Sequence, residues 1–324
     1  MPFSKLGLSA SITDAVKALG YEKPTSIQQK AIPIVLRGSN LIAAAQTGTG
    51  KTASFVLPIL EKLSHGETQR KKRARAIILT PTRELALQVH QSIEAYGKNL
   101  PLRSMAMFGG VDYAPQKQAL IEGVDIVVST PGRLIDLYGQ RAIYFDEVEM
   151  LVLDEADKML DMGFIDDVRD IASKLPEEHQ TVLFSATMSR EIKKLSGDLL
   201  VSPEYVEAPR ETVVANTIDH SVLMVPYQHK KDLLMHVLAQ EGKDRVIVFV
   251  RTKATTETLA AAIEEEVEGA KASAIHGDRP QKARERTLRA FKNGRFSILV
   301  ATDVAARGID VSGITHVINY DLPI

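Results

Sequence analysis

The hydrophobic pattern of the chain repeats one unit, a short apolar run followed by a longer segment with helical spacing. In the first two thirds, residues 83–96 and 190–200 are examples of the helical pattern. Strands that alternate with helices in this way predict a parallel sheet covered by helices on both faces. The strands are expected at residues 41–44, 76–80, 102–107, 126–129, 150–153 and 181–185.

A second alternation of the same kind follows a break in the pattern. Residues 203–217, which include Pro, Glu, Arg, Val and Asn, lose the rhythm and are interpreted as a linker region. The sequence therefore predicts two α/β domains, residues 1–208 and 219–324, joined by a linker at 209–218. Strands of the second domain are expected at residues 219–225, 246–250, 273–276, 297–301 and 316–320.

The composition fits this organisation and narrows the function. A chain of 324 residues can build two domain cores, and a content of 44% hydrophobic and 25% charged residues is typical of globular proteins. The 40 basic and 41 acidic residues give a net charge of -1, so nucleic acid would have to bind through a local arrangement of charge. The chain has no Trp and only 5% aromatic residues, which disfavours a platform of stacked bases.

Residue content and charge runs exclude or disfavour several kinds of site. The chain has no Cys, so disulfides and thiolate metal sites are excluded, and its eight His lack the paired spacing of a zinc site. The N-terminus has no signal-peptide core and no run reaches membrane-spanning length, so we expect a cytoplasmic protein that does not enter a membrane. The basic run 70–75 could touch phosphates, but we favour a solvated loop, and we interpret the acidic run 264–266 in the same way.

A glycine-rich loop lies between the first predicted strand and an apolar helical segment. Such a loop turns its backbone N–H groups inward, where they can hold phosphate oxygens at a helix N-terminus. Lys51 offers a positive charge to the outer phosphates, and the Thr52 hydroxyl can bind Mg²⁺. A plain turn rich in Gly and Thr is disfavoured, because Gly-Lys-Thr has the right offset between strand and helix. The loop consists of Ala45, Gln46, Thr47, Gly48, Thr49, Gly50, Lys51 and Thr52, with Ala45 where the usual pattern has Gly.

Carboxylates follow the apolar run 150–153. A strand that ends in carboxylates delivers them to the carboxyl edge of the sheet, where ligands bind in open α/β folds. Asp154 could hold the Mg²⁺ that bridges two phosphates, and Glu155 could orient and deprotonate the attacking water. Two acids after a strand can also be a simple helix cap, but the phosphate loop upstream weakens that alternative.

The tetrad Asp154-Glu155-Ala156-Asp157, taken with the phosphate loop, resembles the DEAD-box family of ATP-dependent RNA helicases. Further motifs follow in the family's order over nearly the whole chain. Residues 20–28 resemble the Q motif, so the resemblance implies that Gln28 reads the adenine edge, supported by the upstream aromatic Phe3. It also implies two RecA-like domains and ATP with Mg²⁺ as cofactors. In its local sequence features, the chain is most similar to the bacterial RhlE-type subgroup.

The resemblance further implies an RNA-binding surface. In the first domain, three motifs place backbone N–H groups, hydroxyls or an arginine at strand-to-helix junctions, which suits phosphate oxygens. They contain Pro81, Thr82, Arg83, Gly109, Gly110, Thr130, Pro131, Gly132 and Arg133. Residues that resemble the link between ATP state and strand separation are Asp157, Ser185 and Thr187. In the second domain, Arg251, Gln281, Arg284 and Thr302 match positions for RNA, and Gly308 and Asp310 match motif V positions near ATP.

The chain departs from the family at its last residues, 321–324. The family continues with a helix bearing His-Arg-Ile-Gly-Arg-Thr-Gly-Arg, whose arginines meet the γ-phosphate. Such an arginine can raise the rate of phosphoryl transfer by orders of magnitude. We therefore expect a truncated chain with an incomplete second domain, and we expect efficient hydrolysis and unwinding of the intact parent rather than of this chain.

Three functions remain open from the sequence. The favoured one is an RNA-dependent ATPase and helicase that binds RNA with little sequence preference, separates short duplexes locally, and hydrolyses ATP to release the RNA. In that function, both domains share one ATP and one RNA strand and close on them. The alternatives are an ATP-gated RNA clamp or scaffold with little turnover, and a DNA-acting motor of the same superfamily. Gln28 and the intact acidic tetrad disfavour the DNA motor.

Overall fold

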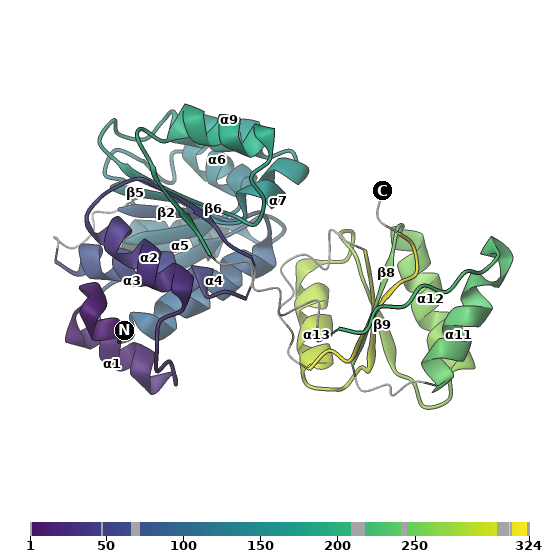
Figure 1. Cartoon of the computed structure of the whole chain (residues 1–324). Coiled ribbons are helices and arrows are strands. Elements are labelled where there is room, and N and C mark those ends of the chain that lie inside the picture. Colours follow the sequence, from purple (N-terminus) through teal and green to yellow (C-terminus); the bar gives the residue numbers. More distant parts are fainter. Residues whose placement is uncertain are drawn as a thin grey trace. The chain divides into compact units, whose positions relative to one another are not determined.

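The computed structural model describes residues 2–46, 48–65, 72–208, 218–240, 245–302, 311 and 313–322, without the side chains of residues 240, 281 and 282. The chain divides into two compact units, Met1–Val213 and Val214–Ile324. In the first unit, helices cover both faces of a central sheet, and a smaller sheet in the second unit has α13 on one face and α11 and α12 on the other (Figure 1). The predicted α/β fold with two parallel sheets is therefore confirmed.

The first unit is built on seven parallel strands in the order β3-β4-β2-β5-β6-β1-β7. The five strands from β4 to β1 in this order are buried at every residue, because helices cover both of their faces. Six strands coincide with predicted apolar runs. The strands are β1 (Leu41–Ala44), β2 (Ala76–Leu79), β3 (Ser104–Met107), β4 (Ile126–Ser129), β5 (Met150–Leu153), β6 (Gln180–Ser185) and β7 (Glu204–Glu207).

Strand β7 lies within the segment that the sequence pattern assigned to a linker, so that assignment was wrong for residues 204–207. Its sequence is Glu-Tyr-Val-Glu, and three of its four residues are exposed. The strand lies at the edge of the sheet and, among the strands described, pairs only with β1. Because an edge strand needs no continuous apolar run, the hydrophobic pattern gave no signal for it.

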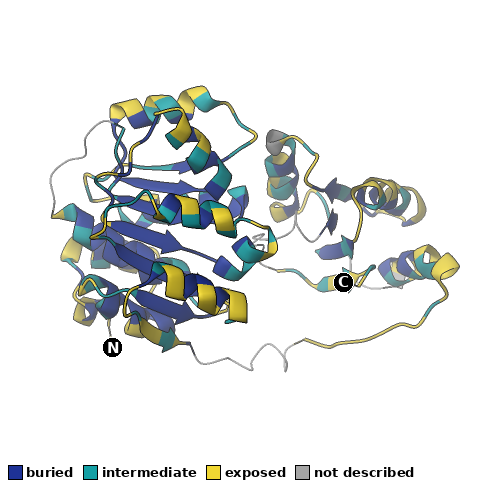
Figure 2. Cartoon of the chain, turned by 90° about the horizontal axis from the view of Figure 1, so that it is seen from above, coloured by how far each residue is buried: buried dark blue, intermediate teal, exposed yellow. Residues whose placement is uncertain are grey.

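Two hydrophobic cores hold the helices of the first unit against the sheet. One lies under α1 to α4 and includes Phe55 and Phe184, whose ring centroids are 5.3 Å apart. The other lies under α5 to α9. Figure 2 shows the buried strands between helices whose outer faces are exposed. The helices are η1 (Phe3–Leu6), α1 (Ala10–Ala18), α2 (Ser26–Leu36), α3 (Lys51–Ser64), α4 (Arg83–Tyr96), α5 (Tyr113–Glu122), α6 (Pro131–Gly139), α7 (Ala156–Asp161), α8 (Ile165–Ala172) and α9 (Arg190–Leu199).

The second unit contains four parallel strands in the order β11-β8-β10-β9. Its core lies mainly between this sheet and α11 and α12. The strands are β8 (Val246–Val250), β9 (Ala272–Ile275), β10 (Ile298–Thr302) and β11 (His316–Asn319). The helices are η2 (Tyr227–His229), α11 (Lys230–Gln240), α12 (Lys253–Glu266) and α13 (Gln281–Lys292). None of the helices described in either unit is long and apolar enough to cross a membrane.

The predicted strand at residues 219–225 was wrong. The backbone of this segment, which is fully described, makes no strand pairing. Its apolar side chains Val222, Leu223 and Met224 are 85%, 57% and 93% exposed. Apolar patterning alone does not make a strand, because the backbone also needs a neighbouring strand to supply its hydrogen bonds.

Candidate functional site

The phosphate loop leaves β1 at the carboxyl edge of the first sheet and ends at the start of α3. Gly48 and Gly50 have φ values of 85° and 88°, a left-handed backbone that glycine adopts without strain. Gly50 is the N-cap of α3, so Lys51 is the first helical residue. The Thr49 hydroxyl donates to the carbonyl of Gln46 at 2.7 Å and closes the turn. The loop thus has the strand-loop-helix geometry in which backbone N–H groups bind phosphate.

Lys51 and Asp154 are buried polar groups without protein partners at their key atoms. Their exposed fractions are 6% and 2%, and Lys51 Nζ and Asp154 Oδ1 make no hydrogen bond in the part of the chain described. Burial raises the pKa of Asp154 to about 6, an effect that the positive charge of Lys51 opposes. Unpaired buried groups cost free energy, so this pair is suited to a ligand that carries both a cation and an anion.

These residues fit Mg²⁺ with a nucleotide rather than a metal ion held by protein alone. No group of three or more His, Asp or Glu residues that could hold a metal occurs among the residues described. Mg²⁺ in nucleotide sites usually takes one or two protein oxygens and completes its shell with phosphate and water. Asp154 and the half-buried Thr52 hydroxyl are the oxygens available here.

Glu155 lies directly after β5 in an unusual backbone conformation. Its φ of 57° and ψ of 51° are left-handed, which is uncommon for a residue other than glycine and often occurs at functional sites. The side chain is buried, and its Oε2 lies 2.9 Å from Lys158 Nζ. The proposed base is therefore held beside Asp154 and is ion-paired with a lysine one turn along α7.

Gln28 joins the Q motif to the phosphate loop. It is 2% exposed, and its Oε1 accepts a hydrogen bond from Thr25 N at 2.9 Å. Its Nε2 donates to the carbonyl of Gly50 at 3.1 Å. The amide predicted to read adenine thus contacts the phosphate loop and caps α2. Phe3 is buried in the core beneath η1 and α2.

Asp157 organises the end of β6. Its Oδ2 accepts hydrogen bonds from Ala186 N at 3.2 Å, Thr187 N at 3.0 Å and Thr187 Oγ1 at 3.2 Å. The Ser185 hydroxyl donates to the carbonyl of Thr187 at 2.6 Å. The three residues predicted to couple ATP state to strand separation therefore form one hydrogen-bonded unit that includes the last residue of the acidic tetrad.

Two predicted RNA motifs are helix N-termini at the carboxyl edge of the same sheet. Thr82 caps α4, and its side chain accepts a hydrogen bond from Leu85 N at 3.2 Å. Thr130 is the N-cap of α6. Gly132 has open space where a Cβ would stand. The free N–H groups of helix N-termini are suited to phosphate oxygens. The predicted residues at these junctions are Pro81, Thr82, Thr130, Pro131 and Gly132.

The remaining first-unit RNA residues meet at the turn 109–113. Gly110 has a φ of 77°, and a Cβ built on it would lie 2.2 Å from Nη1 of Arg83, so a side chain there would collide with the guanidinium. Gly109 also lies next to Arg83, which a Cβ would approach to 3.6 Å. Arg133 also contacts this segment, because its Nη2 donates to the carbonyl of Val111, and it is only 5% exposed. Its guanidinium stacks on the ring of Tyr113, a residue that the sequence analysis did not single out.

In the second unit the predicted residues differ in exposure. Arg251 is exposed, and its backbone N–H donates to Asp321 Oδ2 at 2.9 Å. Asp321 also pairs with Lys230 at 2.7 Å, and no sequence motif indicated either contact. Arg284 and Thr302 are each only 8% exposed. Thr47, Gly308, Asp310 and the side chain of Gln281 lie outside the described residues.

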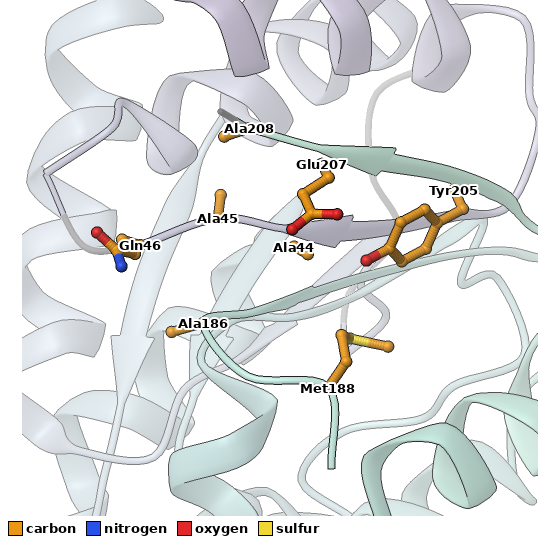
Figure 3. Close-up of a pocket in the computed structure, with 8 residues that line it drawn as sticks. All are labelled: Ala44, Ala45, Gln46, Ala186, Met188, Tyr205, Glu207 and Ala208. Atoms are coloured by element: carbon orange, nitrogen blue, oxygen red, sulfur yellow. The ribbon is translucent and has the colours of Figure 1, made fainter. Parts of the chain in front are cut away.

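A small pocket of about 80 Å³ adjoins the start of the phosphate loop. Figure 3 shows Tyr205 and Glu207 projecting from β7 and Met188 from the segment after β6. The pocket is far smaller than the roughly 300–1,000 Å³ of typical ligand sites, so it does not hold a whole nucleotide. The sequence gave no signal for it, because β7 was not predicted. Its lining residues are Ala44, Ala45, Gln46, Ala186, Met188, Tyr205, Glu207 and Ala208.

Comparison with known proteins agrees with this geometry. Residues 25–195 match the family described as DEAD/DEAH box helicase, and residues 229–324 match the helicase conserved C-terminal domain. The ATP-dependent RNA helicase CshA of Listeria monocytogenes is 43% identical over 99% of this chain and 61% of its own length. The chain thus spans about three fifths of the curated relatives it matches. Their names do not test the RhlE-type subgroup, which stays a prediction.

Solved structures of DEAD-box proteins also resemble this chain. A DEAD box protein from Methanococcus jannaschii is 40% identical, with a TM-score of 0.60, over 100% of this chain and 86% of the other. Dbp5 of S. cerevisiae bound to RNA and ADP BeF3 is 31% identical, with a TM-score of 0.84, over 99% of this chain and 81% of the other. Since the family match covers more than half of the chain and runs through the phosphate loop and the acidic tetrad, this chain belongs to the DEAD/DEAH box helicase family.

Proposed function

We propose that the chain is the catalytic part of an ATP-dependent RNA helicase. The observation that carries the proposal is the buried pair Lys51 and Asp154 beside a left-handed glycine loop, a pair whose Nζ and Oδ1 make no hydrogen bond to any described residue. A cation bridging phosphates would satisfy Asp154, and the phosphates would satisfy Lys51. The curated relatives bear the name ATP-dependent RNA helicase, which supports the same activity for the parent of this chain.

In the proposed ATP site, the loop backbone and Lys51 bind the phosphates, and Thr52 and Asp154 hold Mg²⁺. Bound Mg²⁺ would neutralise charge on the phosphates during transfer. Glu155 orients the attacking water and accepts its proton, while its Oε2 lies 2.9 Å from Lys158 Nζ. Gln28 contributes the adenine contact, and its hydrogen bond to Gly50 ties base recognition to the shape of the loop.

The proposed RNA surface consists of the helix N-termini at Thr82 and Thr130 with the turn 109–113. These groups contact phosphate and ribose rather than base edges, so little sequence preference is expected. The likeness to Dbp5, whose solved structure contains RNA and ADP BeF3, supports binding of the same ligands here. Arg251, Gln281, Arg284 and Thr302 are the residues proposed to contribute from the second unit.

Asp157 is proposed to couple the two sites. It follows the tetrad residues Asp154 and Glu155, and its Oδ2 accepts two hydrogen bonds from Thr187 and one from Ala186. A change at the γ-phosphate that shifts α7 would therefore move the end of β6. We propose that this coupling separates short RNA duplexes locally and that hydrolysis releases the RNA. A cytoplasmic location belongs to the proposal, because ATP and RNA occur together there.

The test is ATP turnover by the full-length parent with Glu155→Gln. The amide keeps the size of the side chain but cannot accept a proton, and loss of a general base typically costs about 10²–10⁴-fold in rate. RNA-stimulated phosphate release should fall by this factor while ATP binding persists. A wild-type rate would show that Glu155 is not the base. Stronger stimulation by DNA than by RNA of the same sequence would overturn the proposed substrate.

A further inference from the structure

The side chain of Arg133 is enclosed by the turn 109–113. Its Cζ lies 3.7 Å from the centre of the Tyr113 ring, a close stacking contact. Its Nη2 donates to the carbonyl of Val111 at 3.2 Å. The Tyr113 hydroxyl donates to Asp136 Oδ2 at 3.0 Å, one turn further along α6. Tyr113 thus contacts Arg133 with its ring and the same helix with its hydroxyl.

The guanidinium of Arg133 is not satisfied by these contacts. Its Nε and Nη1 are buried and have no hydrogen-bond partner among the described residues. Three N–H bonds of a positive charge are therefore without an acceptor, an arrangement that is costly unless a ligand completes it. Stacking engages only the face of the guanidinium, so the N–H bonds in its plane remain able to donate to an acceptor that uncovers their buried edge.

Arg133 stands at a suitable place for an anionic acceptor. It is the third residue of α6, after Pro131 and Gly132, and helical side chains lean back toward the helix N-terminus. The free N–H groups of that terminus favour phosphate as well. The acceptor of matching charge and geometry is a phosphate of the RNA backbone.

We propose that Tyr113 is a positioning residue for RNA binding, which holds the guanidinium of Arg133 so that its unpartnered edge receives a backbone phosphate. The inference rests on the proposed RNA-binding function and adds a residue outside the sequence motifs. Tyr113 does not itself contact the RNA. It acts through the orientation of Arg133, with the ring as the essential part and the hydroxyl as an anchor to α6.

The experiment measures binding of a fluorescent single-stranded RNA at several salt concentrations, with Mg²⁺ and a non-hydrolysable ATP analogue. The variants are Tyr113→Ala, Tyr113→Phe, Arg133→Ala and the double variant Tyr113→Ala with Arg133→Ala. Tyr144→Ala is the matched control, because the centre of this ring lies 5.7 Å from Cζ of the half-buried Arg73 and outside the proposed site. Thermal unfolding of each variant is recorded in parallel.

We expect Tyr113→Ala and Arg133→Ala each to lower the slope of log affinity against log salt by about 0.7, the value for one phosphate contact on a single strand. The double variant should bind no more weakly than Arg133→Ala, and Tyr113→Phe should keep the wild-type slope. Tyr144→Ala should behave as wild type. A merely structural tyrosine would lower the melting temperature without changing the slope.

Two other outcomes overturn the inference in distinguishable ways. If wild type binds RNA and the losses of RNA affinity caused by the two alanine substitutions add in the double variant, Tyr113 does not act through Arg133, while the proposed function stands. An unchanged slope in Tyr113→Ala has the same meaning. If wild type fails to bind RNA under any of these conditions, the proposed function fails and the inference fails with it.

Discussion

The contact between Gly50 and Gln28 allows a comparison of two glycines in one loop. Both Gly48 and Gly50 have left-handed backbones, with φ values of 85° and 88°. A Cβ at position 48 would meet nothing within 4 Å. A Cβ at position 50 would lie 2.5 Å from Gln28 Nε2 and 3.1 Å from Thr25 Oγ1. Gly48→Ala therefore adds backbone strain alone, whereas Gly50→Ala adds the same strain and displaces the Gln28 amide.

The expected losses of stability follow from the backbone strain and from the displacement of the Gln28 amide. A left-handed backbone costs a non-glycine residue about 1–2 kcal/mol, which applies to both variants. Displacing Gln28 removes its hydrogen bond to Gly50, a loss of about 1 kcal/mol. For a unit of this size, about 1 kcal/mol shifts the melting temperature by about 2–4 °C. Gly50→Ala should therefore melt about 2–4 °C below Gly48→Ala.

The assay is thermal unfolding without nucleotide, followed by circular dichroism and calorimetry. The two alanine variants are measured in the wild-type background and again in a Gln28→Ala background. Removing the Gln28 amide also removes the collision, so the difference between Gly50→Ala and Gly48→Ala should largely disappear there. Equal melting temperatures in the wild-type background, or a difference that persists without Gln28, would refute the reasoning.

Two further predictions concern coupling and pH. Asp157→Ala removes the acceptor that holds Thr187, so the variant should lose more of its strand-separation activity than of its ATP turnover. Equal losses in phosphate-release and duplex-separation assays would contradict this coupling role. Burial lowers the pKa of His90, opposed by Glu94, so the folded state favours the neutral ring and the unfolded state binds the proton first as pH falls. Between about pH 7.5 and 5.5, a range that spans the ordinary His pKa of ~6.5, the melting temperature of the wild type should fall further than that of His90→Asn. Equal falls in the two proteins would contradict this prediction.

Buried strands were predictable from the sequence because both faces of each are covered. Runs such as Ala76–Leu79 and Met150–Leu153 are buried at every position and form continuous apolar segments in the sequence. The edge strand β7 and the segment 219–225 mark the limit of this signal. In β7 pairing exists without a continuous apolar run, and in 219–225 apolar residues exist without pairing.

The candidate site was predictable where local chain order determines it. The phosphate loop and the acidic tetrad follow β1 and β5, and parallel strands bring them to one edge. Contacts between distant segments were not predictable. The stacking of Arg133 on Tyr113 and the hydrogen bond from Gln28 to Gly50 depend on rotamers that spacing does not specify.

The proposed function requires that binding of ATP and binding of RNA are coupled in this chain. The direct measurement is the affinity of the chain for one single-stranded RNA with and without Mg²⁺ and a non-hydrolysable ATP analogue, with Lys51→Ala as the control. We predict tighter RNA binding with nucleotide in the wild type, and by linkage tighter nucleotide binding with RNA, whereas Lys51→Ala should lose most of the effect. The same RNA affinity with and without nucleotide in the wild type would contradict the claim.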